Sequence, residues 1–354
     1  MKKMKWVNGY VKMSKSYNFD VVVVGSGPSG TAAAISCASR GLRVVIIDGE
    51  SFPRYRPGET LHPGIEPLLK ELGVADKVQK AGFLRHKGNW VKWDGERHFV
   101  PFGSDENGSW YGFQAWRADF DMILLERAIS LGVEVRQPCH ALQPIVHKNQ
   151  IIGVLTSMGE IYSPFLIDAT GRRQWLARKL KLKVDKYSPQ LIARFGYVQG
   201  KCPLHDDAPA IVADDMGWTW TAKIRSDVYQ WTQLSFDNVV LKSDWIPEEF
   251  QGLKPMGKPN GADVTWRIIT QPGGPGYFLV GDAAAVLDPA SAHGVLKAIM
   301  SGMMAAHSIE KIVKTGQKED NIILGYCKWI RNWFEHDVEK LKKLYALIPS
   351  FRGF

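Results

Sequence analysis

Residues 19–48 read FDVVVVGSGPSGTAAAISCASRGLRVVIID, and this stretch decides the fold of the first part of the chain. Residues 19–24 are a β-branched run followed by glycine, which is typical of a buried parallel strand. Residues 29–40 are rich in small residues and predict a helix that Gly41 ends. Residues 43–48 form a second buried run. The sequence therefore predicts a complete strand–helix–strand unit close to its start.

The turn that opens the helix has the glycine spacing of a phosphate-binding loop. Gly25 permits the tight turn, Gly27 lets a pyrophosphate approach the backbone, and Gly30 lets the helix pack on the strand. The exposed N–H groups and the helix dipole then bind phosphates. The predicted phosphate-binding residues are Gly25, Gly27, Pro28, Ser29 and Gly30.

An acidic residue ends the second strand. Asp48 lies about 20 residues after the glycines, where a carboxylate accepts hydrogen bonds from ribose hydroxyls. Strand, turn, helix and carboxylate together predict a dinucleotide site, with a merely tight turn as the alternative. NAD and FAD share this motif, so later segments must decide between them.

Length and composition set the outer limits. The 354 residues predict two lobes or one elaborated α/β unit, and the 45% hydrophobic content supplies a large core. The four cysteines lie far apart and form no CxxC pair, which excludes a thiolate zinc site and argues against a disulfide framework. We expect no metal site and a cytoplasmic protein. No signal peptide and no transmembrane segment are expected, because no long apolar run is present.

The chain carries a formal net charge of +9, concentrated near its two ends. This charge predicts a solvated basic surface, or docking of an anionic cofactor or an acidic partner protein. Nucleic-acid binding is not expected, because no recognised motif accompanies the charge.

The pattern changes twice along the chain. Residues 83–115 and 190–270 alternate between apolar and polar residues, which predicts antiparallel strands. Other segments return to buried strands and amphipathic helices. We therefore predict an α/β fold in which an antiparallel substrate sheet is inserted into a discontinuous nucleotide-binding domain and helices follow at the C-terminus. The predicted ranges are 18–80, 113–175 and 271–317 for the nucleotide-binding domain, 81–112 and 176–270 for the substrate domain, and 318–354 for the helical segment.

Three later motifs bear on the cofactor. They are Arg117 in WRADFD, the DATG segment from Asp168 to Gly171, and Asp282 in GDAA. With the glycine turn, they resemble the group-A-type flavin monooxygenases and the related flavin-dependent halogenases. The resemblance implies FAD as cofactor, with Arg117 against its phosphates or ribose, Asp168 and Gly171 behind the adenosine, and Asp282 on the ribityl chain.

The resemblance extends to the flavin ring. It implies that backbone amides around Gly294 and Val295 face the isoalloxazine pyrimidine and stabilise negative charge on the reduced ring. His62 and His293 lie in segments expected to face the same pocket, as a catalytic acid or base. The alternative for each is a histidine hydrogen-bonded to backbone. Electrons would come from NAD(P)H that binds transiently or from a separate flavin reductase.

Residues 56–60, RPGET, resemble a loop of the halogenases and of the LodB-like and QhpG-like flavoproteins. The QhpG-like proteins oxygenate a tryptophan in a partner protein to build a quinone cofactor. The resemblance implies that Arg56 approaches the FAD and that Glu59 lies beside the flavin as a catalytic residue. The alternative for Glu59 is a carboxylate that stabilises its own loop.

Several positions depart from the halogenase pattern. Trp218 and Trp220 resemble the WxWxIP signature, but Ala-Lys replaces Ile-Pro. His86 stands where halogenases need a lysine, with Lys87 one residue away, and Ala292 stands where they have a serine. We therefore predict oxygenation without halogenation.

The predicted function is FAD-dependent hydroxylation of an electron-rich aromatic ring by dioxygen, through a flavin C4a-hydroperoxide. The predicted substrate is a tryptophan side chain of a partner protein or peptide. The alternatives are a halogenase, a geranylgeranyl-reductase-like flavoprotein and a non-catalytic flavin-fold binding module. The basic C-terminal segment would help to dock the partner, or it only packs against the FAD domain. Its residues in question are Lys328, Trp329, Arg331, Trp333, Lys340, Lys342 and Lys343.

Overall fold

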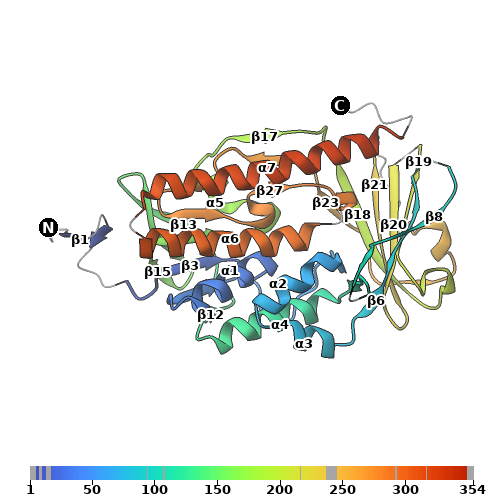
Figure 1. The fold of residues 1–354 in the computed structure, drawn as a ribbon, viewed down its shortest axis with the longest axis horizontal. Coiled ribbons are helices and arrows are strands. Elements are labelled where there is room, and N and C mark those ends of the chain that lie inside the picture. Colours follow the sequence, from blue (N-terminus) through green and yellow to red (C-terminus); the bar gives the residue numbers. More distant parts are fainter. Residues whose placement is uncertain are drawn as a thin grey trace.

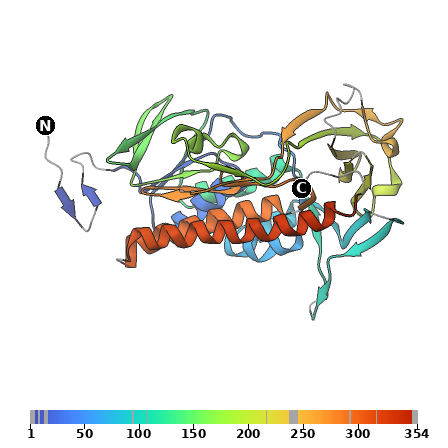
Figure 2. The ribbon, with the colours of Figure 1, turned by 90° about the horizontal axis from the view of Figure 1, so that it is seen from above.

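A computed structural model gives the fold in Figure 1. It describes residues 5–7, 10–12, 17–93, 95–106, 108–215, 217–236, 245–291, 293–315 and 317–348. An α/β part holds one six-stranded sheet, and a larger antiparallel sheet lies at the other end of the molecule. Two long C-terminal helices run along the α/β part toward the larger sheet (Figures 1 and 2).

The six-stranded sheet is the predicted nucleotide-binding layer. Its order is β12–β4–β3–β16–β26–β25, and every neighbouring pair is parallel except β26–β25. Strands β3 and β4 are buried on both faces, which explains their continuous β-branched sequence. The strands are β3 (Val21–Val24), β4 (Val44–Ile47), β12 (Glu134–Arg136), β16 (Phe165–Asp168), β25 (Gly273–Gly274) and β26 (Tyr277–Leu279).

Small residues let two helices pack closely beside this sheet. Helix α1 (Pro28–Ser39) contacts α6 (Gly294–Thr315), and a Cβ at Gly302 would lie 2.2 Å from the Ser29 carbonyl oxygen. Ala32, Ala33 and Ala34 of α1 are fully buried for the same reason. The other helices are α2 (Glu66–Glu71), α3 (Ala75–Lys80), α4 (Arg117–Ser130), α5 (Trp175–Lys179) and α7 (Glu319–Tyr345).

The larger sheet has the order β22–β18–β21–β20–β19–β7–β8, with β23 also paired to β18. Its pairs are antiparallel except β19–β7. Burial varies from strand to strand, since β8 is exposed along its length and β21 is almost wholly buried. The strands are β7 (Gly88–Lys92), β8 (His98–Pro101), β18 (Ile192–Gln199), β19 (Ala210–Asp214), β20 (Gly217–Arg225), β21 (Val228–Ser235), β22 (Lys254–Pro255) and β23 (Asn260–Asp263).

Smaller sheets complete the fold. The order β5–β11–β6 joins the flavin-side loop to the larger sheet, and β13–β14–β15 packs near β16. The sequence patterns did not predict this last sheet. The remaining strands are β1 (Lys5–Val7), β2 (Tyr10–Lys12), β5 (Thr60–Leu61), β6 (Leu84–His86), β9 (Ser104–Asp105), β10 (Gly108–Ser109), β11 (Gly112–Gln114), β13 (Ala141–His147), β14 (Gln150–Thr156), β15 (Gly159–Tyr162), β17 (Val184–Lys186), β24 (Arg267–Ile269) and β27 (Ala285–Val286).

The predicted fold class is confirmed: a Rossmann-type α/β layer, a mainly antiparallel second sheet and C-terminal helices. One detail cuts across the predicted domain ranges, which remain a prediction. Strands β17 and β24 lie in the predicted substrate domain, yet β24 pairs with β27 of the predicted nucleotide-binding domain. Among the described residues, no helix is long and apolar enough to cross a membrane.

Candidate functional site

In the turn between β3 and α1, two glycines are required by close backbone contacts, whereas the third has open space beside it. Gly25 has φ +103°, and a Cβ there would lie 2.5 Å from the Ala169 carbonyl oxygen. A Cβ at Gly30 would lie 2.0 Å from the Gly25 carbonyl oxygen. A Cβ at Gly27 would instead meet only Arg54 Nη2, at 3.6 Å, among the described atoms within 4 Å. The N-terminus of α1, which also includes Pro28, therefore has an open face at Gly27 where a pyrophosphate fits.

Asp48 ends β4 beside this turn. Its carboxylate accepts hydrogen bonds from Ser26 N (2.7 Å) and Ser26 Oγ (2.5 Å), and it forms an ion pair with Arg54 Nη1 at 2.8 Å. Burial opposes ionisation, but Arg54 and Ser26 outweigh it and lower the pKa of Asp48. A charged carboxylate is therefore held next to the open face.

Arg54 is a site residue that the sequence reasoning missed. It lies between Asp48 and Gly27, with a side chain only 11% exposed. The sequence reasoning chose Arg56 instead, but Arg56 pairs with Glu50 at 2.6 Å and is 43% exposed. Two arginines two residues apart give no sequence signal for which one faces the nucleotide side.

The DATG segment closes the neighbouring turn. Asp168 is fully buried, and its two carboxylate oxygens accept from Thr170 N (2.9 Å) and Leu176 N (2.8 Å). Its contacts therefore hold the turn itself. Gly171 has φ +63°, and a Cβ there would meet no described atom within 4 Å, so its backbone is open.

Asp282 differs from Asp168 in that its carboxylate is left without such hydrogen bonds among the described residues. No hydrogen bond joins its carboxylate to another described residue, and the side chain keeps partial exposure. Burial raises its pKa, and the positive charges of Arg172, Arg267 and Arg117 oppose that effect. An incompletely satisfied acceptor of this kind fits a hydroxyl-bearing ligand such as a ribityl chain.

The loop of residues 56–60 lies beside the start of α6. A Cβ at Gly58 would lie 3.2 Å from Arg117 Nη1 and 4.0 Å from Val295 Cγ2, whereas a Cβ at Gly294 would meet no described atom within 4 Å. The first amides of α6 therefore have open space next to the loop. The open turn, the two carboxylates and these amides fit FAD, although the individual cofactor contacts remain predictions.

Arg117 is committed to positioning this loop. It is buried, bonds Asp121 through Nε and Nη2, and donates from Nη1 to the Pro57 carbonyl oxygen at 2.8 Å. The phosphate or ribose contact predicted for Arg117 would have to use whatever donor capacity remains. Its position explains why an arginine opens α4: it ties that helix to the flavin-side loop.

Glu59 joins the loop to the larger sheet. Gly58 N donates to Glu59 Oε2 at 2.8 Å, and the Tyr197 hydroxyl on β18 donates to Oε1 at 2.5 Å. Burial raises the pKa of Glu59, although Tyr197 and Arg117 oppose that shift. These contacts match the loop-stabilising alternative, and they join the loop of residues 56–60 to the larger sheet.

Three histidines and one phenylalanine form what we call the histidine cluster: His62, His86, Phe102 and His293. The ring of His62 lies edge-to-face with His293 at 5.0 Å and with Phe102 at 5.5 Å between ring centres. Phe102 in turn lies 5.3 Å from His86. The structure thus brings together His62 and His293, the predicted acid–base candidates, with His86, which was predicted to stand at the halogenase lysine position.

Both ring nitrogens of His86 are occupied. Nδ1 lies 2.9 Å from the Gly88 carbonyl oxygen, and Nε2 lies 3.0 Å from Gln114 Nε2, which can only donate. Burial lowers the pKa of His86, so the ring is neutral with its proton on Nδ1. Gly112 makes room, because a Cβ there would lie 2.9 Å from the ring. Lys87 is exposed, so His86 rather than Lys87 belongs to the cluster.

His62 also has a defined tautomer. Its Nδ1 accepts from Gly64 N at 3.0 Å, which places the proton of the neutral ring on Nε2. Burial, and then the neighbouring His293, lower its pKa to about 4. His62 is therefore a neutral hydrogen-bond donor at Nε2.

The two tryptophans of β20 differ in role. Trp218 is buried and donates from Nε1 to the Tyr345 hydroxyl at 2.7 Å, whereas Trp220 is half-buried. Tyr345 donates to Asp288 at 2.8 Å, so Trp218 anchors the end of α7. β20 lies beside β6 and β11, next to the histidine cluster. Ala292 lies outside the described residues.

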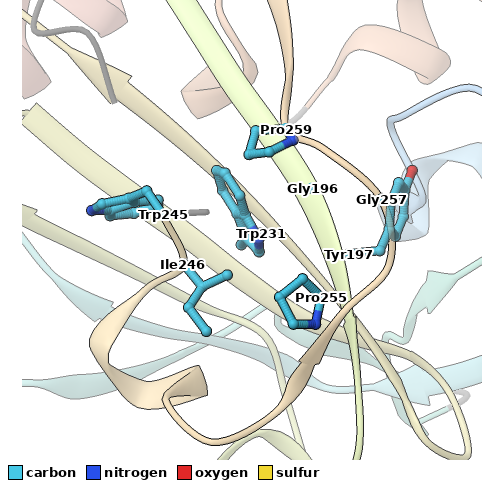
Figure 3. Close-up of a pocket in the computed structure, with 8 residues that line it drawn as sticks. All are labelled: Gly196, Tyr197, Trp231, Trp245, Ile246, Pro255, Gly257 and Pro259. Atoms are coloured by element: carbon cyan, nitrogen blue, oxygen red, sulfur yellow. The ribbon is translucent and has the colours of Figure 1, made fainter. Parts of the chain in front are cut away.

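A small apolar hollow lies on the other face of the larger sheet (Figure 3). Gly196 makes room there for the ring of Trp231, since a Cβ would lie 2.8 Å from it. Tyr197 is the neighbour of Gly196 on β18 and points its hydroxyl to Glu59 instead. Since adjacent residues of a strand face opposite sides, the hollow and the flavin side are separated by the sheet.

Comparisons with known proteins identify the family of the chain. Residues 18–223 match the family model described as FAD binding domain. A 1H-pyrrole-2-carbonyl-[peptidyl-carrier protein] brominase from Pseudoalteromonas luteoviolacea is 27% identical, over 97% of this chain and 89% of that protein. A tryptophan 2-halogenase from Chondromyces crocatus is 30% identical over 83% of this chain, which spans 61% of that relative.

Solved structures show the same fold. The flavin-dependent brominase Bmp2 superposes with a TM-score of 0.77 at 27% identity, over 90% of this chain and 83% of that one. The myxobacterial chondrochloren halogenase CndH superposes with a TM-score of 0.84, over 93% of this chain and 83% of that one. At 24% identity, the second likeness concerns the fold alone.

Proposed function

Because the chain belongs to the FAD binding domain family, we propose that it is an enzyme that halogenates an electron-rich aromatic ring with reduced FAD, dioxygen and a halide. The chain is a halogenase-like, FAD-dependent flavoprotein of the oxidoreductase type. The observation that carries the proposal is the similarity to a brominase over 97% of the chain. Hydroxylation, which the sequence alone favoured, is not the activity for which these relatives are named.

The chain's own residues have separable tasks in this proposal. The turn at Gly27 binds the pyrophosphate, Asp48 and Asp282 accept from sugar and ribityl hydroxyls, and the first amides of α6 stabilise negative charge on the ring. When bound and reduced, FAD supplies the oxidising chemistry by reacting with dioxygen. Glu59 and Arg117 hold the loop against the cofactor. A separate flavin reductase, or NAD(P)H directly, supplies the electrons.

The proposed substrate is a heteroaromatic ring carried by a protein. Two relatives are named for a pyrrole bound to a peptidyl-carrier protein, and a third for tryptophan. The half-buried Trp220 and Phe195 project from the same face of the sheet as Tyr197, toward the flavin side. Aromatic walls of this kind suit a flat, electron-rich ring. The quinone-cofactor role suggested by the RPGET loop remains a narrower prediction within this class.

Hydroxylation is the second candidate, and one observation favours it. His86 occupies the halogenase lysine position, and both of its nitrogens are hydrogen-bonded. It therefore offers no free amine, so the lysine chemistry that the resemblance implies for halogenases has no counterpart at residue 86.

Product mass decides between the two reactions. The purified chain would be supplied with FAD, a flavin reductase, bromide or chloride, and labelled dioxygen. The substrates would be carrier-bound pyrrole-2-carboxylate, a tryptophan peptide and free tryptophan. We expect a halide-dependent isotope pattern on a carried ring, and none with Gly27→Val. Incorporation of labelled oxygen into the product would instead establish hydroxylation, and turnover of free tryptophan alone would refute the carried substrate.

A further inference from the structure

A buried charged pair lies between the two C-terminal helices, which run side by side in Figures 1 and 2. Lys297 of α6 contacts Asp337 of α7 directly, and its ammonium lies 4.4 Å from the centre of the Trp333 ring. The side chains of Lys297 and Asp337 are only 16% and 8% exposed. Burial, and then the charge of Lys340, lower the pKa of Lys297 to about 7, so holding this pair away from water is costly and calls for an explanation beyond helix packing.

The pair also reaches the histidine cluster. Asp337 Oδ2 lies 3.9 Å from Nδ1 of His293, the residue that directly precedes α6. The two nitrogens of an imidazole lie on opposite edges of the ring, so Nδ1 faces α7 while Nε2 faces away from it. At 3.9 Å these two atoms are not hydrogen-bonded, but the negative charge of a carboxylate beside Nδ1 still favours the tautomer with its proton on Nδ1, which leaves a lone pair on Nε2.

We propose that Asp337 is a positioning residue for His293, that Lys297 fixes the Asp337 carboxylate, and that His293 Nε2 accepts the proton released from the substrate ring. This inference rests on the proposed function. When an aromatic ring is halogenated or hydroxylated, an electron pair of the ring forms the new carbon–halogen or carbon–oxygen bond as the electrophilic atom's bond to its leaving oxygen breaks. The C–H bond at that carbon then breaks, and its electron pair restores the aromatic ring. The proton then goes to Nε2, and Asp337 stabilises the resulting imidazolium.

The charges around His293 support this role. It faces His62 from the segment before α2, Asp337 and Lys340 from α7, and Lys297 on its own helix. Burial, and then Lys297 and Lys340, lower the pKa of His293. The pKa of His293 falls to about 4, so the resting ring is neutral at pH 7 and keeps a lone pair for a proton.

His62 complements this arrangement. Its Nδ1 is used by Gly64 N, so its neutral ring donates at Nε2. The two edge-to-face rings thus present one donor and one acceptor, although both are neutral histidines. His62 can therefore donate a hydrogen bond to a polar group of the substrate, while His293 takes up a proton.

Histidine NMR tests the positioning directly, without cofactor or substrate. The full chain would be labelled with ¹⁵N-histidine, and His293→Gln would identify the His293 signals among the nine histidines. We expect the Nδ1–H tautomer in the unchanged protein, loss of that preference in Asp337→Asn, and its return in Asp337→Glu. A dominant Nε2–H tautomer in the unchanged protein would overturn the proposal.

Lys297 gives an independent variant if Asp337→Asn fails to fold. Lys297→Met removes a positive charge beside His293 and leaves Asp337 to interact with His293 alone. The pKa of His293 should therefore rise by about 1–3 pH units. Lys297→Arg should leave the pKa near its original value, and Lys343→Met is the matched control on the exposed side of α7. An unchanged pKa in Lys297→Met would also overturn the proposal.

Activity then separates this inference from the proposed function. In Asp337→Asn, we expect kcat to fall roughly 10- to 100-fold with little change in KM or bound flavin, and the pH profile to move with the measured pKa of His293. Unchanged kcat with an altered tautomer would refute the catalytic role of His293. A product that is neither halogenated nor hydroxylated would refute the proposed function. The NMR experiment would still test, independently, whether Asp337 positions His293.

Discussion

Replacing Gly27 should separate cofactor binding from folding. Its φ of −70° and ψ of −179° are open to any residue, and a Cβ would have only Arg54 Nη2 nearby, at 3.6 Å. Gly27→Val therefore introduces no clash with the backbone. Because valine is a poorer N-cap than glycine, we expect the free energy of unfolding to fall by no more than about 1 kcal/mol.

FAD binding should respond far more strongly to Gly27→Val. The new side chain fills the open face at the N-terminus of α1, where backbone N–H groups would bind the pyrophosphate. Each hydrogen bond to a charged group contributes about 1.5–3 kcal/mol. Losing two costs about 3–6 kcal/mol, which weakens FAD binding by roughly 10²- to 10⁴-fold.

Gly30→Ala is the matched comparison within the same turn. Its Cβ would lie 2.0 Å from the Gly25 carbonyl oxygen and 3.0 Å from the Ala169 Cβ, so it should destabilise the fold itself by several kcal/mol. Flavin absorbance of the purified proteins, titration of the cofactor-free forms with FAD, and urea unfolding measure the effects. The reasoning is refuted if Gly27→Val binds FAD as tightly as the unchanged chain, or if it unfolds as readily as Gly30→Ala.

Three further changes test the surroundings of the site. Tyr197→Phe removes a hydrogen-bond donor to buried Glu59 and should lower the free energy of unfolding in urea by about 1–3 kcal/mol. Because burial raises the pKa of Glu59, this loss should be larger at pH 8, where the carboxylate is charged, than at pH 5. An equal loss at both pH values would contradict the prediction. Burial raises the pKa of Asp288 from 3.8 to about 6, so its ionisation destabilises the folded state as pH rises through that range. The free energy of unfolding of Asp288→Asn, relative to that of the unchanged chain, should therefore increase by up to about 3 kcal/mol between pH 4 and pH 7. A difference between the two proteins that does not change with pH would count against the prediction. Gly112→Ala places a Cβ 2.9 Å from the His86 ring and should shift that ring's NMR signals while FAD binding persists; unchanged signals would show that the ring has room.

The sequence predicted the fold well where local pattern and burial agree. The buried runs of β3 and β4 and the small residues of α1 are all fixed by their neighbours in the chain, and they appear within one or two residues of the predicted limits. The sheet β13–β15 was missed. Its first strand has no fully buried residue and contains Pro144, so it carries neither a clear alternation nor a continuous apolar run.

The site was predicted less completely, because many of its contacts join residues far apart in sequence. Glu59 meets Tyr197 across 138 positions, and His86 meets Gln114 across 28. Nothing in a single sequence marks such partners. Motif resemblance identified Glu59 and His86 by position, but the hydrogen bonds that limit what each can do depend on the assembled sheets.

The C-terminal helix shows how one sequence pattern can serve two purposes. Its basic and aromatic residues were predicted to dock a partner or to pack against the FAD domain. Trp329 and Trp333 are half-buried against the core, which matches packing, and Trp333 lies under Lys297. Tyr345 at the end of the helix is buried and bonds Asp288. Helix α7 therefore holds both the carboxylate facing His293 and the anchor beside the larger sheet, so a partner that displaced it would disturb the histidine cluster.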